Sequence, residues 1–177
     1  MSLIVLILII LLLLIIYRII WLLYVRKTIR NLLVKLICEF EKADVKYWVD
    51  FGSLLGMMRE KDVILGDNDG DVCILQSDQE NTDTVRKIVE NMGGKYFEWG
   101  AFRVYDGFIF IDIYLVKDDD EFKQNDGNIV KQRVSLGDND FTASIPKDPH
   151  NHLTRRYGSD WQTPVYKWYF LYTKYLT

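Results

Sequence analysis

The stretch FGSLLGMMREKDVILGDNDGDVCIL, residues 51–75, carries the pattern that decides the fold. Gly52 and Ser53 interrupt a short strand predicted at residues 47–51, and a helix is predicted over residues 54–59. An acidic segment, residues 67–71, then leads into a strand predicted over residues 71–75. A strand, a helix and a second strand in such close succession are typical of a sheet that has helices packed against it.

Further elements are predicted on both sides of this stretch. Apolar residues at helical spacing predict a helix over residues 27–43, and a capping-box sequence at 77–80 opens a helix that Gly93 and Gly94 end. Strands are expected at 96–99, 102–105, 108–116 and 129–135, and the chain beyond residue 140 is expected to be irregular. The pattern predicts an α/β (α+β) fold, with a mixed sheet of about five strands flanked by helices.

An apolar run precedes this domain. Residues 3–25 are aliphatic or aromatic apart from Arg18, and as a helix they would cover about 34 Å, enough to cross a bilayer. Tyr17, Trp21 and Tyr24 favour the membrane interface, so the expected span is residues 3–20, with Arg18 reaching out to water. We expect an uncleaved transmembrane anchor over residues 1–26 and a main domain over residues 27–177. The alternative is a buried helix of a soluble core.

The net charge of −3 conceals an uneven distribution. The first thirty residues carry four bases and no acid, which leaves 18 bases and 25 acids in the remainder. We expect no nucleic-acid partner, because affinity for nucleic acids depends on neutralising phosphates. The bases Arg26, Lys27 and Arg30 follow the apolar run, and by the positive-inside rule they favour a cytosolic main domain.

Three aspartates are candidate metal ligands. Asp69 and Asp71 are two residues apart, so on a strand their carboxylates project from one face. Asp112 is the isolated acid of an apolar strand, where a carboxylate is costly unless it is paired or binds a cation. Carboxylates from two neighbouring strands can hold Mg²⁺ for phosphoryl transfer. The alternatives are a simple turn at residues 67–71 and a solvent-facing edge position for Asp112.

Together these motifs resemble the LicD family, which includes fukutin and fukutin-related protein. Residues 51–59 are similar to the family's Gly-Thr/Ser-Leu-Leu-Gly-x-x-Arg segment, residues 67–71 to its Asp-x-Asp-x-Asp box, and YGSDWQTP at 157–164 to its Tyr-Gly-x-x-Trp-x-x-Pro element. The chain departs from the family at Gly66, where members usually have an aromatic residue, and at Asn68, where they often have an acid or a histidine.

The resemblance implies a nucleotidyltransferase-like fold and a metal-dependent phosphotransferase. Such an enzyme moves a phospho-alcohol, such as phosphocholine or ribitol or glycerol phosphate, from a CDP-alcohol donor to a hydroxyl of a glycan acceptor. It implies Mg²⁺ or Mn²⁺ as the cofactor, with the catalytic and metal-binding residues Asp69, Asp71 and Asp112, of which Asp112 would also be the general base. The residues implied to bind substrate are Gly52, Ser53, Arg59 and Asp67.

Two other functions are compatible with the same residues. One is nucleotidyl transfer to a small molecule or a protein, and the other is a membrane-anchored pseudoenzyme that serves as a scaffold. The side of the membrane also stays open, because the basic residues favour the cytosol whereas the single N-terminal anchor is similar to that of Golgi or ER lumenal members. His150 and His152 are interpreted as surface loop residues.

Overall fold

The computed structural model describes residues 2–117 and 128–164. Its main sheet has five strands in the order β1-β2-β5-β4-β3, in which β2 and β5 are parallel and the other pairs antiparallel. The strands are β1 (Trp48–Val49), β2 (Asp69–Leu75), β3 (Lys95–Phe97), β4 (Ala101–Asp106) and β5 (Ile109–Val116). A separate antiparallel pair is formed by β6 (Ile129–Leu136) and β7 (Asn139–Pro146). The expected mixed α/β sheet is confirmed.

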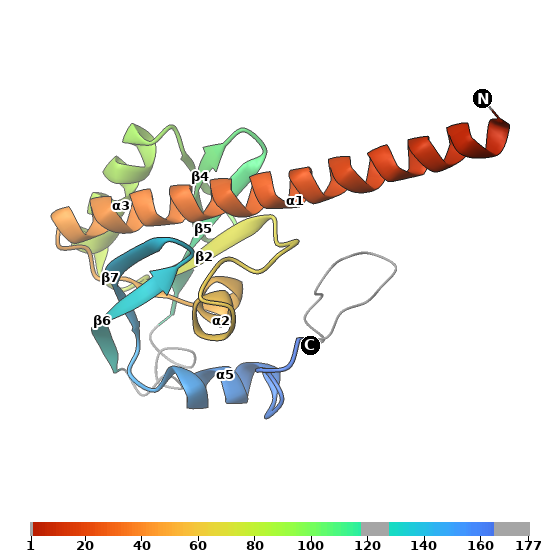
Figure 1. Cartoon of the computed structure of the whole chain (residues 1–177). Helices are drawn as coiled ribbons and strands as arrows, with labels where there is room; N and C mark the ends of the chain where they lie inside the picture. Colours follow the sequence, from red (N-terminus) through yellow and green to blue (C-terminus); the bar gives the residue numbers. More distant parts are fainter. Residues whose placement is uncertain (1, 118–127, 165–177) are drawn as a thin grey trace.

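The helices of the described chain are α1 (Leu3–Lys42), α2 (Phe51–Arg59), α3 (Gln79–Asn91) and α5 (Pro149–Tyr157). Figure 1 shows α1 crossing the domain and extending well beyond its strands at the N-terminal end. The C-terminal part of α1 packs in the hydrophobic core, with Ile29, Leu33 and Phe40 fully buried. Alternation along the strands points Ile111 and Ile113 into this core, which leaves Asp112 on the opposite face of the sheet.

The long helix α1 has no break at residue 26, where the anchor and the main domain were predicted to meet. Residues 3–20 are exposed except for the half-buried Arg18, and burial begins at Leu22. Within the described residues, α1 is the one helix long and apolar enough to cross a membrane, and its apolar window is unburied. One helix therefore contains both the candidate span and part of the core.

The expectation of irregular chain beyond residue 140 is wrong. Strand β7 buries Ala143 and Ile145, and helix α5 follows directly. The prolines mark the ends of these elements, since Pro146 is the last residue of β7 and Pro149 lies in the first turn of α5 behind the N-cap Asp148. The last residues, 165–177, lie outside the described part.

Candidate functional site

The parallel pairing of β2 and β5 brings two of the predicted carboxylates side by side. Asp71 and Asp112 are direct Cα partners in this pair, and Asp69 lies two residues before Asp71 on β2, opposite Phe110. Neighbouring strands are about 4.8 Å apart, so Asp71 and Asp112 project from adjacent positions on one face. Asp112 is 3% exposed in an interior strand, which excludes the solvent-facing edge position.

The first turn of α2 is linked to this acidic strand by a hydrogen bond. The Ser53 hydroxyl oxygen accepts the backbone N–H of Asp71 at 2.8 Å, and both Gly52 and Ser53 are buried. A Cβ at Gly70 would lie 2.5 Å from Ile111 Cδ1 and 3.3 Å from Ser53 Oγ, so the glycine lets helix and strand approach. Phe51 has φ +49°, a strained conformation for a bulky residue that is often found at functional sites.

The acidic segment concentrates negative charge. Burial, then repulsion from Asp69 and Asp67, raises the pKa of Asp71 well above its ordinary value. Burial and the neighbouring Asp69 raise the pKa of Asp67 to about 7, and burial also raises the pKa of Asp69. Within the described chain none of the three is in an ion pair. A cation would relieve this repulsion.

The third predicted carboxylate, that of Asp112, has a different partner. Arg103 lies opposite it on β4 and binds both carboxylate oxygens, with Nε at 2.5 Å and Nη2 at 2.8 Å. The guanidinium also lies over the Phe110 ring, 3.7 Å from its centroid. Arg103 thus occupies both oxygens of Asp112. The described residues contain no preassembled group of three His, Cys, Asp or Glu side chains around a metal position.

A buried polar cluster beside the site was not predicted. Asp50, the N-cap of α2, lies 2.7 Å from His152 Nε2 and 3.3 Å from Arg156 Nη2, and it accepts the Trp48 indole N–H at 3.1 Å. The interpretation of His152 as a surface loop residue is therefore wrong, because it is 4% exposed and lies on α5. Burial alone would raise the pKa of Asp50, but the His152 hydrogen bond and the Arg156 charge outweigh it and lower the pKa.

The sequence offered one weak sign of this cluster. Asp50 directly precedes the FGS motif, and His152 and Arg156 are four residues apart, which places them on one face of a helix. The contact fixes the start of α2 against α5.

Arg59, a predicted substrate-binding residue, lies at the end of α2. Its Nη1 is 3.4 Å from the Trp161 carbonyl oxygen and its Nη2 is 3.0 Å from Glu60, so the motif at residues 51–59 contacts the motif at residues 157–164. Its Nε is buried and has no hydrogen-bond partner within the described part of the chain.

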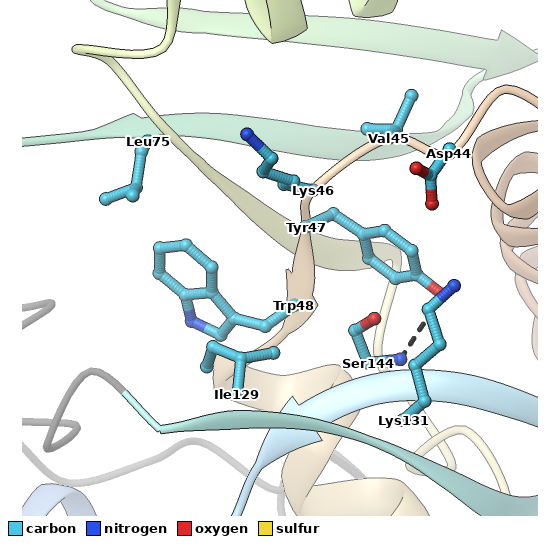
Figure 2. A pocket seen from close by; sticks show the side chains of 9 residues that line it. All are labelled: Asp44, Val45, Lys46, Tyr47, Trp48, Leu75, Ile129, Lys131 and Ser144. Atoms are coloured by element: carbon cyan, nitrogen blue, oxygen red, sulfur yellow. Dashed lines mark hydrogen bonds between the residues drawn. The ribbon is translucent and has the colours of Figure 1, made fainter.

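A cavity of about 310 Å³ lies elsewhere, around β1 and the end of β2. Figure 2 shows Trp48, Leu75 and Ile129 along one side, with Lys46 and Lys131 among the other lining residues. Both lysines have acidic partners, Asp78 and Glu41 respectively. None of the predicted site residues lines this cavity.

The family model described as LicD/FKTN/FKRP, nucleotidyltransferase domain, matches residues 44–167, in agreement with the fold expected from the motifs. A solution structure of the antibiotic-resistance factor ANT(2'')-Ia is similar, with 20% identity and a TM-score of 0.43 over 54% of this chain and 50% of that one. In this match the chain spans about half the length of the solution structure.

A crystal structure of ANT(2'')-Ia in complex with adenylyl-2''-tobramycin is also similar, with 14% identity and a TM-score of 0.47. That match covers 80% of this chain and 81% of the other. No curated protein matches the chain.

Proposed function

This chain belongs to the LicD/FKTN/FKRP nucleotidyltransferase-domain family of transferases, and we propose that it is a phosphotransferase of the LicD type. It would move a phospho-alcohol, such as phosphocholine or ribitol or glycerol phosphate, from a CDP-linked donor to a glycan hydroxyl. The observation that carries the proposal is the placement of Asp71 beside Asp112, with the first turn of α2 hydrogen-bonded to Asp71 through Ser53.

The residues present fit a divalent cation. Asp69 and Asp71 offer carboxylate oxygens, the ligands that Mg²⁺ and Mn²⁺ prefer. Burial, and then repulsion from neighbouring acids, raises the pKa of both, and a bound cation would oppose that repulsion. When bound, such an ion supplies charge neutralisation at the donor pyrophosphate. Asp67, hydrogen-bonded to Asp69, would orient that carboxylate.

The start of α2 is suited to a phosphate. The first N–H groups of a helix have no partner within the helix and carry a partial positive charge. Gly52 and Ser53 contribute such groups, and Arg59 at the other end of α2 contributes a buried guanidinium. These residues would position the phosphates of the donor for attack.

Asp112 is the proposed base that accepts the proton of the attacking hydroxyl. It can do so when one of its two oxygens is released by Arg103. Arg103 would then keep hold of the other oxygen and so fix the orientation of the carboxylate.

The full chain in detergent micelles is the material for the test, because α1 contributes Leu22 and Val25 to the core. CMP release from a panel of CDP-alcohols would be measured with Mg²⁺ or Mn²⁺, with and without glycan acceptors. We expect metal-dependent CMP release from one donor. It should be lost in the Asp69→Ala/Asp71→Ala double variant and kept in Asp83→Ala, an exposed acid on α3.

Two results would contradict the proposal. Pyrophosphate release from a nucleoside triphosphate, without CMP release from any CDP-alcohol, would favour the nucleotidyltransferase alternative. Absence of both reactions together with absence of Mn²⁺ binding in calorimetry would favour the non-catalytic scaffold.

We also propose that residues 3–20 anchor the chain in a membrane through a single span, on the basis of their length, composition and exposure. Protease protection in sealed vesicles from expressing cells tests both the anchor and its orientation. A cytosolic domain is digested in intact vesicles, whereas a lumenal domain is digested after the vesicles are opened.

A further inference from the structure

The transition from the exposed part of α1 to its buried part is abrupt. Residues 3–20 would extend about 27 Å as a helix, close to the thickness of the hydrocarbon core of a bilayer. Trp21 is half-buried and Leu22 is 7% exposed. Because the helix is continuous, there is no flexible linker between the proposed span and the folded domain.

Four aromatic residues gather at this transition, and we name them the aromatic cluster: Tyr17, Trp21, Tyr24 and Phe108. The first three lie together on α1, where the ring centroid of Trp21 is 6.5 Å from that of Tyr17 and 6.0 Å from that of Tyr24. Phe108 comes from the turn between β4 and β5, and its ring stacks on Trp21 at 5.2 Å with an interplanar angle of 22°. The turn between these two strands is therefore held against α1 where the candidate span ends.

Phe108 is exposed even though it makes this contact. Phe108 is 63% exposed, Tyr17 is 65% exposed and Tyr24 is 53% exposed. Outside α1, the exposed large hydrophobic residues of the described chain are Leu65, Tyr96, Trp99 and Phe108. A phenylalanine at the tip of a hairpin leaves apolar surface in water unless another phase covers it.

We propose that the aromatic cluster is a second membrane contact, in which the β4–β5 turn enters the headgroup region of the same bilayer that α1 crosses. Tyrosine and tryptophan favour the interface, where their rings contact acyl chains and their polar atoms contact water. Phe108 adds an apolar side chain at the same level as Trp21. Arg18 lies inside the proposed span, and its long side chain would reach out toward the lipid phosphates. The continuity of this surface with the unburied apolar helix identifies the partner as a lipid bilayer.

This contact would place the candidate site close to the membrane. Asp112 is four residues after Phe108, on the strand β5 that follows this turn, about 13 Å away along the chain. Asp69 and Asp71 lie beside the same end of β5. The proposal depends on the membrane anchor, but it does not depend on which transfer reaction the site performs.

The test uses a fluorescent probe on the full chain reconstituted in phosphatidylcholine vesicles. Cys38 is exposed and is replaced by serine, while the buried Cys73 is left in place. A thiol-reactive probe is attached in three variants, Phe108→Cys at the turn, Ile10→Cys in the span and Glu80→Cys on α3, which begins beyond the far end of β2. Quenching is measured with lipids that carry a nitroxide close to the headgroup.

We expect the probe at position 108 to be quenched several-fold more strongly than the probe at position 80. The proposal would be overturned if quenching were weak and equal at positions 108 and 80 but strong at position 10 with a nitroxide deep in the acyl chain. That result would mean that the span is inserted and the turn is in water. Absence of quenching at position 10 would overturn it by removing the anchor. CMP release is not used, so a failure here is distinct from a failure of the proposed reaction.

Discussion

Arg103 and Asp112 face each other across β4 and β5 and are joined by two hydrogen bonds, of 2.5 and 2.8 Å. On its other side, Asp112 is the register partner of Asp71 on β2. The carboxylate therefore lies between a fixed guanidinium and a cluster of acids. A metal ion bound at Asp69 and Asp71 would therefore compete with the Arg103 guanidinium for the carboxylate of Asp112.

Replacing Arg103 by alanine should therefore strengthen Mn²⁺ binding, because it removes the competing cation. In metal-free buffer the same variant should be less stable by about 3 kcal/mol, since it leaves Asp112 buried and unpaired. Calorimetric titration and urea unfolding would measure the two effects. Arg133→Ala, which removes an exposed arginine on β6, is the matched control. Unchanged Mn²⁺ affinity in Arg103→Ala would contradict the competition.

The Asp71→Asn variant should be more stable than the parent in metal-free buffer but inactive. Burial and neighbouring charges raise the pKa of Asp71, so its ionised form is unfavourable in the folded chain. Removing the charge should raise the midpoint of thermal unfolding by about 2–4 °C, the shift that 1 kcal/mol produces in a domain of this size. Differential scanning calorimetry in EDTA checks this, and a lower midpoint would show that repulsion is not the dominant effect at this position.

Acid should weaken the contact between α2 and α5. The folded pKa of Asp50 lies below its ordinary value of 3.8, so its contribution to stability is complete above about pH 4 and is lost as the pH falls through the folded pKa. The Asp50→Asn variant lacks this contribution. We expect it to be about 3 kcal/mol less stable than the parent at pH 7, with a smaller difference at about pH 2. Urea midpoints measured at several pH values test this, and a difference that does not change with pH would refute it.

Replacing Gly56 by alanine should destabilise the domain, although alanine is the better helix former by about 1 kcal/mol. A Cβ at this position would lie 2.5 Å from the Asp62 carbonyl oxygen and 3.2 Å from the Ile64 backbone nitrogen. Both atoms belong to the backbone, so they cannot move as a side chain would. We expect a net loss of about 2 kcal/mol in chemical denaturation. A gain in stability would mean that the chain at residues 62–64 shifts at little cost.

Much of the arrangement from residue 48 to residue 116 could be predicted from the sequence. Apolar alternation in the strands and helical spacing in α1 follow from backbone geometry, which is local and therefore visible in the residue order. Asp69 and Asp71 were predicted for the same reason to project from one face of an extended chain, although the predicted strand began at residue 71 and β2 begins at Asp69. Strand β7 was missed because Asn139, Asp140 and Thr142 resemble loop residues, and its burial comes from packing by Ala143 and Ile145.

The amino-acid sequence by itself determined the apolar helix, the presence of a helix between the first two strands and the strands that carry the acids, because each depends on neighbours a few residues apart. Helix α2 begins at Phe51, earlier than the predicted residue 54. The tertiary structure alone decided which side chains meet. His152 reaches Asp50 from 102 positions away, and Arg103 rather than a second acid holds Asp112 because β5 lies between β2 and β4. The tertiary structure also decided the place of Phe108, which lies beside the end of the candidate span because the β4–β5 turn packs on Trp21. Such contacts depend on strand order and helix docking, which are set by the packing of the whole core.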